Sequence, residues 1–232
     1  MTEQKYQQVK GGLIKKTKRR VVGVFIDGIG LDRATRRLNR RIDLAALIKG
    51  VTSGLAPTLA RYYTVVPHED DSRHRSFLDA VSRAGLNVIV KRLPPKGITR
   101  QVTTDIEMST DIVAYALGLS SFNKAFEYLP AEMQAVKNMS VGGAKATISP
   151  ADISESKRQS GPLLNIDPQK SDTTRSLIVI CPTRELSYAM TLAKDLGADT
   201  TTADFGKFNR GDVLKSANKW IDLSDSETIW KD

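Results

Sequence analysis

The chain alternates between short apolar runs rich in β-branched residues and segments whose apolar residues recur at helical spacing. The apolar runs predict buried strands, and the amphipathic segments predict helices. The predicted strands are residues 21–27, 60–66, 86–90, 176–181 and 200–205, and the predicted helices are residues 43–50, 73–84, 104–117, 185–196 and 211–223. This alternation is typical of a parallel sheet with helices on both faces. The expected fold is therefore α/β, a three-layer sandwich with a mainly parallel central sheet.

Three regions fall outside this alternation. Residues 1–20 are polar and end in a basic run, which predicts an N-terminal arm. Residues 118–175 separate the two halves of the chain and combine a helical apolar stripe with a stretch rich in Gly and Pro, for which we expect a loop. Residues 224–232 are interpreted as a C-terminal tail. The expected organisation is a single domain over residues 21–223 with an insertion at about 118–175.

The first predicted strand ends in an acid, Asp27, which is followed by Gly28 and Gly30. Open α/β sheets bind their ligands beyond the carboxyl ends of the strands, and Asp27 would stand there. An Asp-Gly pair also forms tight turns, so a purely structural role for Asp27 stays open.

Two further aspartates lie on the predicted helix 104–117. Thr104 and Glu107 have the spacing of a capping box, which would place Asp105 in the first helical turn. Helical geometry places Asp105 and Asp111 on either side of one groove, roughly 9 Å apart along the helix axis. The helix dipole is enough to explain Asp105. Asp111 falls in an otherwise apolar stretch, so it needs either a metal ion or a basic side chain as a partner.

Charge indicates the kind of partner. The chain has 35 Lys and Arg against 26 Asp and Glu, a formal charge of +9 and a pI near 9.6, which favours a polyanion such as nucleic acid. The basic residues form two clusters around the first strand: Lys15, Lys16, Lys18, Arg19 and Arg20 before it, and Arg33, Arg36, Arg37, Arg40 and Arg41 after it. Each cluster is explained either as solvated surface charge or as phosphate contacts.

Several classes of chemistry are excluded. The single cysteine, Cys181, excludes an internal disulfide and fits a reducing compartment, so we expect a cytoplasmic protein. No run approaches the length of a membrane span, and we expect neither a membrane partner nor a secretory signal. His68 and His74 lack the spacing of a zinc site. Residues 27–30 form neither a Walker sequence nor a complete dinucleotide fingerprint.

The order of these motifs resembles the NYN domain, a branch of the PIN-like ribonucleases. The resemblance rests on the strand ending in Asp27-Gly28-x-x-Leu31 and on Asp105-x5-Asp111 in the later helix. In that family a strand-end Asp, two Asp on a helix and an Asp after the fourth strand gather around Mg²⁺ or Mn²⁺, and the enzymes cut single-stranded or structured RNA. The resemblance implies Asp27, Asp105 and Asp111 as catalytic residues and metal ligands.

The chain departs from the family pattern at two places. The family has Ser-Gly-Asp-x-Asp-Phe after the fourth strand, where this chain has residues 181–186, so Thr183 and Glu185 replace the expected acids. The Asn that usually follows the first Asp by three positions is Gly30 here. Glu185 is then either a metal ligand acting through water or an ordinary acid at the start of a helix.

Together these features favour a metal-dependent endoribonuclease in which Mg²⁺ or Mn²⁺ activates water for hydrolysis of RNA phosphodiesters. Because the last acidic motif is altered, two alternatives remain. One is an RNA-binding module without turnover, whose affinity would fall with salt. The other is an assembly protein that uses the insertion at 118–175. DNA and a second copy of the chain are further candidate partners.

Overall fold

The computed structural model describes most of the chain outside the long insertion. Lys16, Lys18 and most of the insertion lie outside the described residues. The described residues are 6–9, 12–15, 19–69, 72–119, 127–130, 173–206 and 211–231.

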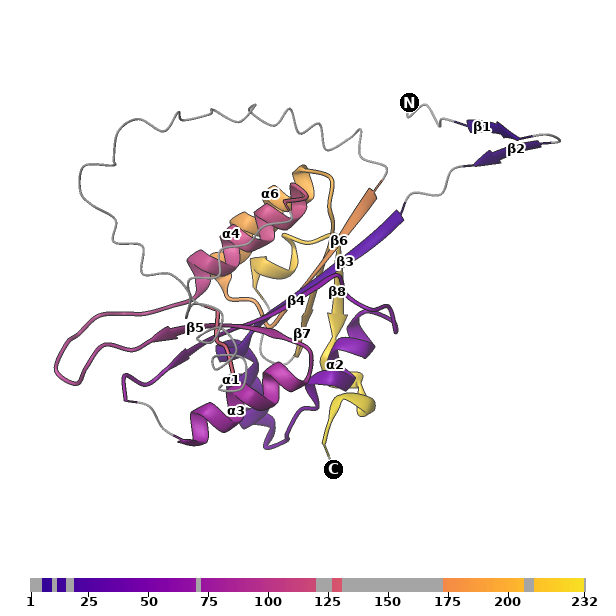
Figure 1. The fold of residues 1–232 in the computed structure, drawn as a ribbon. Helices are drawn as coiled ribbons and strands as arrows, with labels where there is room; N and C mark the ends of the chain where they lie inside the picture. The colour runs from indigo at the N-terminus through magenta and orange to yellow at the C-terminus, as the bar shows by residue number, and fades with distance from the viewer. Residues whose placement is uncertain are drawn as a thin grey trace, which may run out of the picture.

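A six-stranded, fully parallel sheet runs through the centre of the fold (Figure 1). The strand order is β5-β4-β3-β6-β7-β8. The strands are β3 (Arg19–Asp27), β4 (Leu59–Val66), β5 (Asn87–Arg92), β6 (Thr173–Ile180), β7 (Asp199–Asp204) and β8 (Lys219–Asp222). A separate antiparallel hairpin consists of β1 (Tyr6–Val9) and β2 (Gly12–Lys15).

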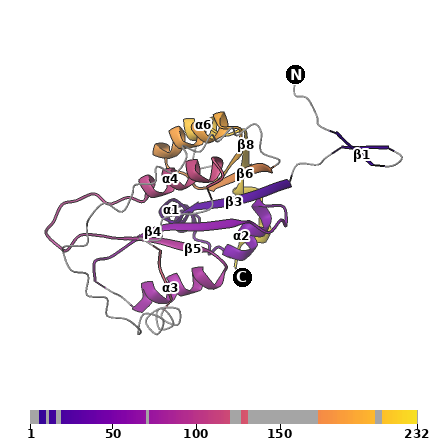
Figure 2. The ribbon, with the colours of Figure 1, turned by 45° about the horizontal axis from the view of Figure 1, so that its top comes forward.

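Helices cover both faces of the sheet, as Figure 2 shows. One face carries α1 (Gly28–Leu38), α2 (Leu44–Val51) and α3 (Ser72–Arg83), and the other carries α4 (Asp105–Ala116) and α6 (Ser187–Asp195). The short 3-10 turns are η3 (Arg184–Leu186), η4 (Asp212–Leu214), η5 (Leu223–Asp225) and η6 (Glu227–Ile229). None of the described helices combines the length and apolarity needed to span a bilayer. The predicted three-layer α/β fold is confirmed.

The central strand β3 is buried on both faces because it lies between two layers of helices. Val24 and Ile26 pack into the core under α1, α2 and α3, whereas Phe25 packs into the core under α4 and α6. Burial on both faces explains why this strand is a continuous apolar run rather than an alternating one. The chain adds β4 and β5 on one side of β3 and β6, β7 and β8 on the other, so the order of the sheet reverses between β3 and β6.

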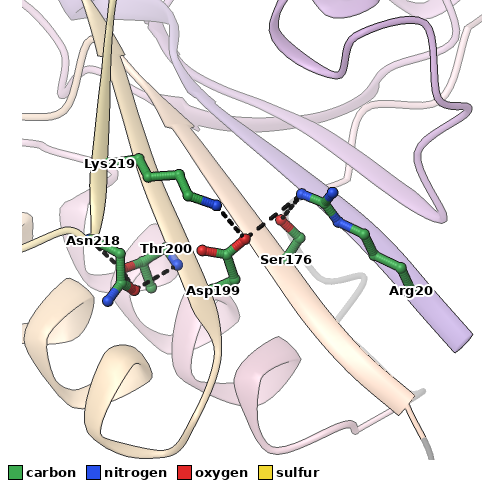
Figure 3. Close-up of polar contacts among 6 residues, drawn as sticks. All are labelled: Arg20, Ser176, Asp199, Thr200, Asn218 and Lys219. Carbon is green, nitrogen blue, oxygen red and sulfur yellow. Dashed lines mark hydrogen bonds and ion pairs between the residues drawn. The ribbon is translucent and has the colours of Figure 1, made fainter. Parts of the chain in front are cut away.

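The predicted helix over residues 211–223 is wrong, because this segment adds the sixth strand instead. Asn218 Oδ1 accepts hydrogen bonds from the Thr200 backbone N at 3.0 Å and from Thr200 Oγ1 at 2.8 Å (Figure 3). These bonds hold Asn218 against β7, and the four residues after it continue the parallel pairing as β8. Tertiary pairing thus overrides the local helical pattern.

The C-terminal segment packs against the domain. Ile229 is 1% exposed and belongs to the core shared with α1, α2 and α3. Ile42 and Trp230 form an isolated antiparallel bridge, and the Arg40 guanidinium lies 4.2 Å from the centre of the Trp230 ring. Residues near the C-terminus therefore contribute to the structure around α1 and α2.

Candidate functional site

Asp27 is buried at the carboxyl end of β3, where it caps α1. Its Oδ1 accepts hydrogen bonds from the backbone N of Ile29 at 3.0 Å and of Gly30 at 3.1 Å. Its Oδ2 is buried and has no hydrogen-bond partner among the described residues. A buried carboxylate oxygen in this state is costly in free energy until a proton or a cation reaches it. Asp27 thus caps α1 through Oδ1, while its Oδ2 has no hydrogen-bond partner among the described residues.

The pKa of Asp27 reflects this environment. Burial raises the pKa of Asp27 from 3.8 to about 6. The hydrogen bonds from the Gly30 and Ile29 amides lower this pKa, as does the charge of Arg33, whereas the negative charge of Asp105 raises it. Asp105 therefore lies within electrostatic range of Asp27. Two carboxylates in such proximity favour either a retained proton or a cation between them.

Asp105 opens α4 and lies against the loop that follows β6. The Thr183 hydroxyl donates a hydrogen bond to Asp105 Oδ1 at 3.1 Å. The capping box is not formed, since Thr104 makes no side-chain cap hydrogen bond and the Asp105 backbone N donates to Thr103 Oγ1 at 3.3 Å instead. The helix nevertheless begins at Asp105, as predicted.

Asp111 lies six residues farther along α4 and has a different environment. Its Oδ2 accepts hydrogen bonds from Arg61 Nη1, in an ion pair, and from the Tyr63 hydroxyl at 2.7 Å. The Arg61 and Asp111 side chains are only 3% and 11% exposed. Of the two partners considered for Asp111, the structure provides the basic side chain. It does not bring Asp111 together with the other two aspartates.

Asp204 is a further buried acid at this edge, and the sequence pattern did not single it out. It ends β7, is 5% exposed, and its Oδ1 accepts a hydrogen bond from the Phe205 backbone N at 2.7 Å. Burial raises the pKa of the Cys181 thiol, and the charges of Asp204 and Asp27 add to this effect. A strand of small and β-branched residues that ends in an acid, as β3 does, is the signal that identifies Asp204.

Cys181 follows β6 with a strained backbone. Its φ is 51°, in the left-handed region that non-glycine residues rarely adopt. Its carbonyl oxygen packs closely on α1, because a Cβ added at Gly30 would lie 2.4 Å from that oxygen and 3.0 Å from Asp27 Oδ2. Residue 30 must therefore lack a side chain. Strain of this kind clusters at ligand sites.

The second basic cluster lies on α1 and the loop after it. Its five arginines are all exposed: Arg33, Arg36, Arg37, Arg40 and Arg41. Arg33 lowers the pKa of Asp27 through its charge, so the cluster begins close to the acids. Positive charge is thus available beside the carboxyl edge of the sheet.

The first basic cluster lies at the other edge. Arg20 donates a hydrogen bond to Ser176 Oγ at 3.2 Å and forms an ion pair with Asp199 at 3.6 Å, and Lys219 pairs with the same acid at 2.9 Å (Figure 3). Asp27 lies seven positions after Arg20 along β3, which corresponds to roughly 23 Å at 3.3 Å per residue. Arg20 thus belongs to a polar network at the amino ends of β3, β6 and β7.

The remaining members of that cluster add little to the site. Arg19 is exposed at the start of β3, and Lys15 ends β2. Lys16 and Lys18 lie outside the described residues. The two basic clusters therefore do not converge on Asp27 within the described part of the chain.

Comparison with known protein families finds a match for the first part of the sheet and its helices. The family model of the NYN domain matches residues 21–123, from β3 to beyond α4. This part of the chain is an NYN domain. The NYN family belongs to the PIN-like nucleases, and the match includes Asp27, Asp105 and Asp111.

A solved structure has a fold similar to that of this chain. It is a protein of unknown function, VPA0982, from Vibrio parahaemolyticus RIMD 2210633, with a TM-score of 0.59 and 9% sequence identity. The alignment covers 97% of this chain and 100% of that chain. A search of the curated proteins finds no match.

The structure gives a physical meaning to the departures from the NYN pattern. Thr183, where the family resemblance leads us to expect the first acid of the altered motif, donates a hydrogen bond to Asp105. Glu185, at the second acid's position, lies exposed in η3. Gly30 takes the place of the usual Asn because the Cys181 carbonyl occupies the space of a side chain there.

NYN nucleases generally depend on a divalent metal, which needs several oxygen ligands. Within the described ranges no group of three or more His, Cys, Asp or Glu side chains is arranged to hold a metal ion. The NYN domain offers a pair instead: Asp27, with its unpartnered Oδ2, and Asp105, whose charge acts on it. Mg²⁺ commonly binds through one or two carboxylates and keeps several waters. The pair fits such a cation.

Proposed function

We propose that this NYN domain is a metal-dependent endonuclease that hydrolyses RNA, with Asp27 and Asp105 holding a Mg²⁺ or Mn²⁺ ion. The observation that carries the proposal is the buried, unpartnered Oδ2 of Asp27 at the switch point of the sheet, within electrostatic range of the Asp105 carboxylate. Asp111 is assigned a structural role in place of the implied metal ligation because Arg61 neutralises it. Glu185 is left as a ligand acting through water at most, because it is exposed.

The chain's own residues prepare this pair for chemistry. The amides of Ile29 and Gly30 fix Asp27 through Oδ1, and the Thr183 hydroxyl orients Asp105. When bound, the cation would lower the pKa of a water and offset the charge that develops on the phosphodiester. Because burial raises the pKa of Asp27 to about 6, Asp27 is mostly ionised only above that pH, and activity should rise with pH through 6.

A second candidate function is RNA binding without cleavage. It is favoured by one observation: a hydroxyl, that of Thr183, stands beside Asp105 where the NYN pattern has an acid. Loss of one carboxylate weakens cation binding because the affinity of such sites depends on the charge of the ligands. In this case the cationic surface would still bind phosphates.

Cleavage of labelled single-stranded RNA in the presence of Mn²⁺ tests the proposal. The wild-type protein should produce fragments, and Asp27→Asn should lower the rate by more than about 100-fold while leaving RNA affinity within about twofold. Asp195→Asn, an exposed acid at the end of α6, is the matched control and should cleave normally. A DNA strand of the same sequence, run in parallel, distinguishes RNA from DNA as substrate.

The outcomes separate the two candidates. RNA binding without fragments in both Mg²⁺ and Mn²⁺ would replace the nuclease by the binding module. Neither binding nor cleavage at low salt would overturn both.

A further inference from the structure

A groove of about 860 Å³ opens on the face of the sheet that carries α1 and α3. The residues that line the groove include Gly28, which follows Asp27, and Arg41 and Lys231. Buried apolar side chains, including Leu31 and Leu78, form part of its lining. The groove therefore lies along the second basic cluster, on the face of the sheet opposite to α4.

The lining of the groove is strongly cationic. Two of its charged side chains are acidic, Asp32 and Asp43, and five are cationic: Arg36, Arg40, Arg41, Arg73 and Lys231. Asp43 is the cap of α2 and accepts a hydrogen bond from the Ala46 backbone N at 3.0 Å. Asp32 pairs with Arg36 at 2.9 Å, but these side chains are 55% and 80% exposed, and such surface pairs contribute little stability. Arg36 can therefore exchange this partner for a phosphate.

An aromatic ring is exposed inside this cationic groove. Phe77 lines it, is 47% exposed, and meets the Tyr62 ring edge to face with the centroids 6.0 Å apart. Tyr62 packs against the start of α1, because a Cβ added at Gly28 would lie 2.7 Å from the Tyr62 hydroxyl. Cationic grooves with exposed aromatic rings bind single strands, whose bases stack on the rings.

We infer that the groove binds a short segment of single-stranded RNA, with phosphates against the arginines and one base against Phe77. This inference rests on the proposed function, because the bound strand is the substrate. The volume is that of a small-molecule pocket, which holds unstacked nucleotides and excludes a duplex. Specific recognition of RNA generally targets such splayed bases.

The test is the affinity of a fluorescent single-stranded RNA, measured by anisotropy in chelator so that no cleavage occurs. Phe77→Leu, which keeps an apolar side chain, should weaken binding roughly 5- to 100-fold, the value of one stacked base. Arg36→Gln with Arg41→Gln should lower the slope of log K against log salt by about 0.7 for each phosphate that is no longer neutralised. The duplex of the same sequence should bind at least about tenfold more weakly than the single strand.

Two matched controls lie outside the groove lining. Trp220→Leu replaces a ring that is 46% exposed on β8, and Arg83→Gln replaces an exposed arginine at the end of α3. Both should bind RNA as the wild type does.

The failure of this inference is distinguishable from failure of the proposed function. Cleavage by the wild type, together with unchanged affinity in the Phe77 and arginine variants, would contradict RNA binding in the groove and support the nuclease activity. Absence of cleavage by the wild type, together with weakened RNA binding by those variants, would contradict the nuclease activity and support RNA binding in the groove. Equal affinity for single strand and duplex would also overturn the groove.

Discussion

The Thr183 hydroxyl donates a hydrogen bond to Asp105 Oδ1 at 3.1 Å, and this contact joins the loop after β6 to the first residue of α4. The resemblance to the NYN family, whose matched segment ends at residue 123, leads us to expect an acid at the position of Thr183. The contact therefore shows where the missing carboxylate would lie, which is beside Asp105. One substitution at this position can restore it.

Thr183→Asp should strengthen Mn²⁺ binding by about tenfold or more, because a third carboxylate adds charge to the cation site. Isothermal titration calorimetry with Mn²⁺ at neutral pH measures this change. Thr183→Val is the control, since it removes the hydroxyl without adding charge and should not gain affinity. Equal affinity in wild type and Thr183→Asp would place the cation elsewhere.

Arg61→Met should lower the free energy of unfolding by about 3–5 kcal/mol, because it leaves the Asp111 carboxylate buried without its cation. The double variant Arg61→Met with Asp111→Leu should recover most of this loss, since it removes both charges. Urea unfolding of the single and double variants tests the pair. No recovery in the double variant would contradict a simple structural ion pair.

Asp27 should make the protein less stable as the pH rises from about 4 to 6. Below pH 3.8 the Asp27 carboxyl is protonated in both the folded and the unfolded state. Between pH 3.8 and about 6 this carboxyl ionises in the unfolded chain but stays protonated in the folded protein, because burial raises its folded-state pKa to about 6. The free energy of unfolding therefore falls by up to about 3 kcal/mol over this range and then stays constant. Asp27→Asn lacks this dependence and should be about 1–3 kcal/mol more stable than wild type at pH 7 in chelator. Urea unfolding at several pH values measures it, and parallel curves for the two proteins would contradict the raised pKa.

Gly30→Ala should destabilise the protein by about 1–3 kcal/mol, although alanine is the better helix former, because its Cβ would overlap the Cys181 carbonyl oxygen. Gly50→Ala in α2 is the matched control. The nearest atom to its Cβ is 3.8 Å away, so this variant should be neutral or up to about 1 kcal/mol more stable. Thermal unfolding of both variants measures these changes in stability. Equal changes in the Gly30 and Gly50 variants would show that the Cys181 loop shifts to make room for the added Cβ.

Much of the fold could be predicted because its signals are local. The apolar run over residues 21–27 predicts a strand that is buried on both faces, and Asp27 at its end marks the carboxyl edge of the sheet. The start of α4 at Asp105 was also predictable, even though Thr103 rather than Thr104 makes the first hydrogen bond.

The rest depends on contacts between distant residues. The sequence left Asp111 with two alternative partners, and only the pairing of β4 with β3 brings Arg61 to it. Likewise, residues 219–222 form a strand because Asn218 is tied to Thr200. Neither relationship leaves a periodic signal.

The central claim is that Asp27 and Asp105 together bind a divalent cation, and Mn²⁺ binding followed by electron paramagnetic resonance at pH 7.5 tests it most directly. We expect the wild type to bind Mn²⁺, Asp27→Asn and Asp105→Asn each to weaken binding by more than about 100-fold, and the exposed control Asp195→Asn to bind normally. Absence of Mn²⁺ binding by the wild type, or undiminished binding by Asp27→Asn, would contradict the claim.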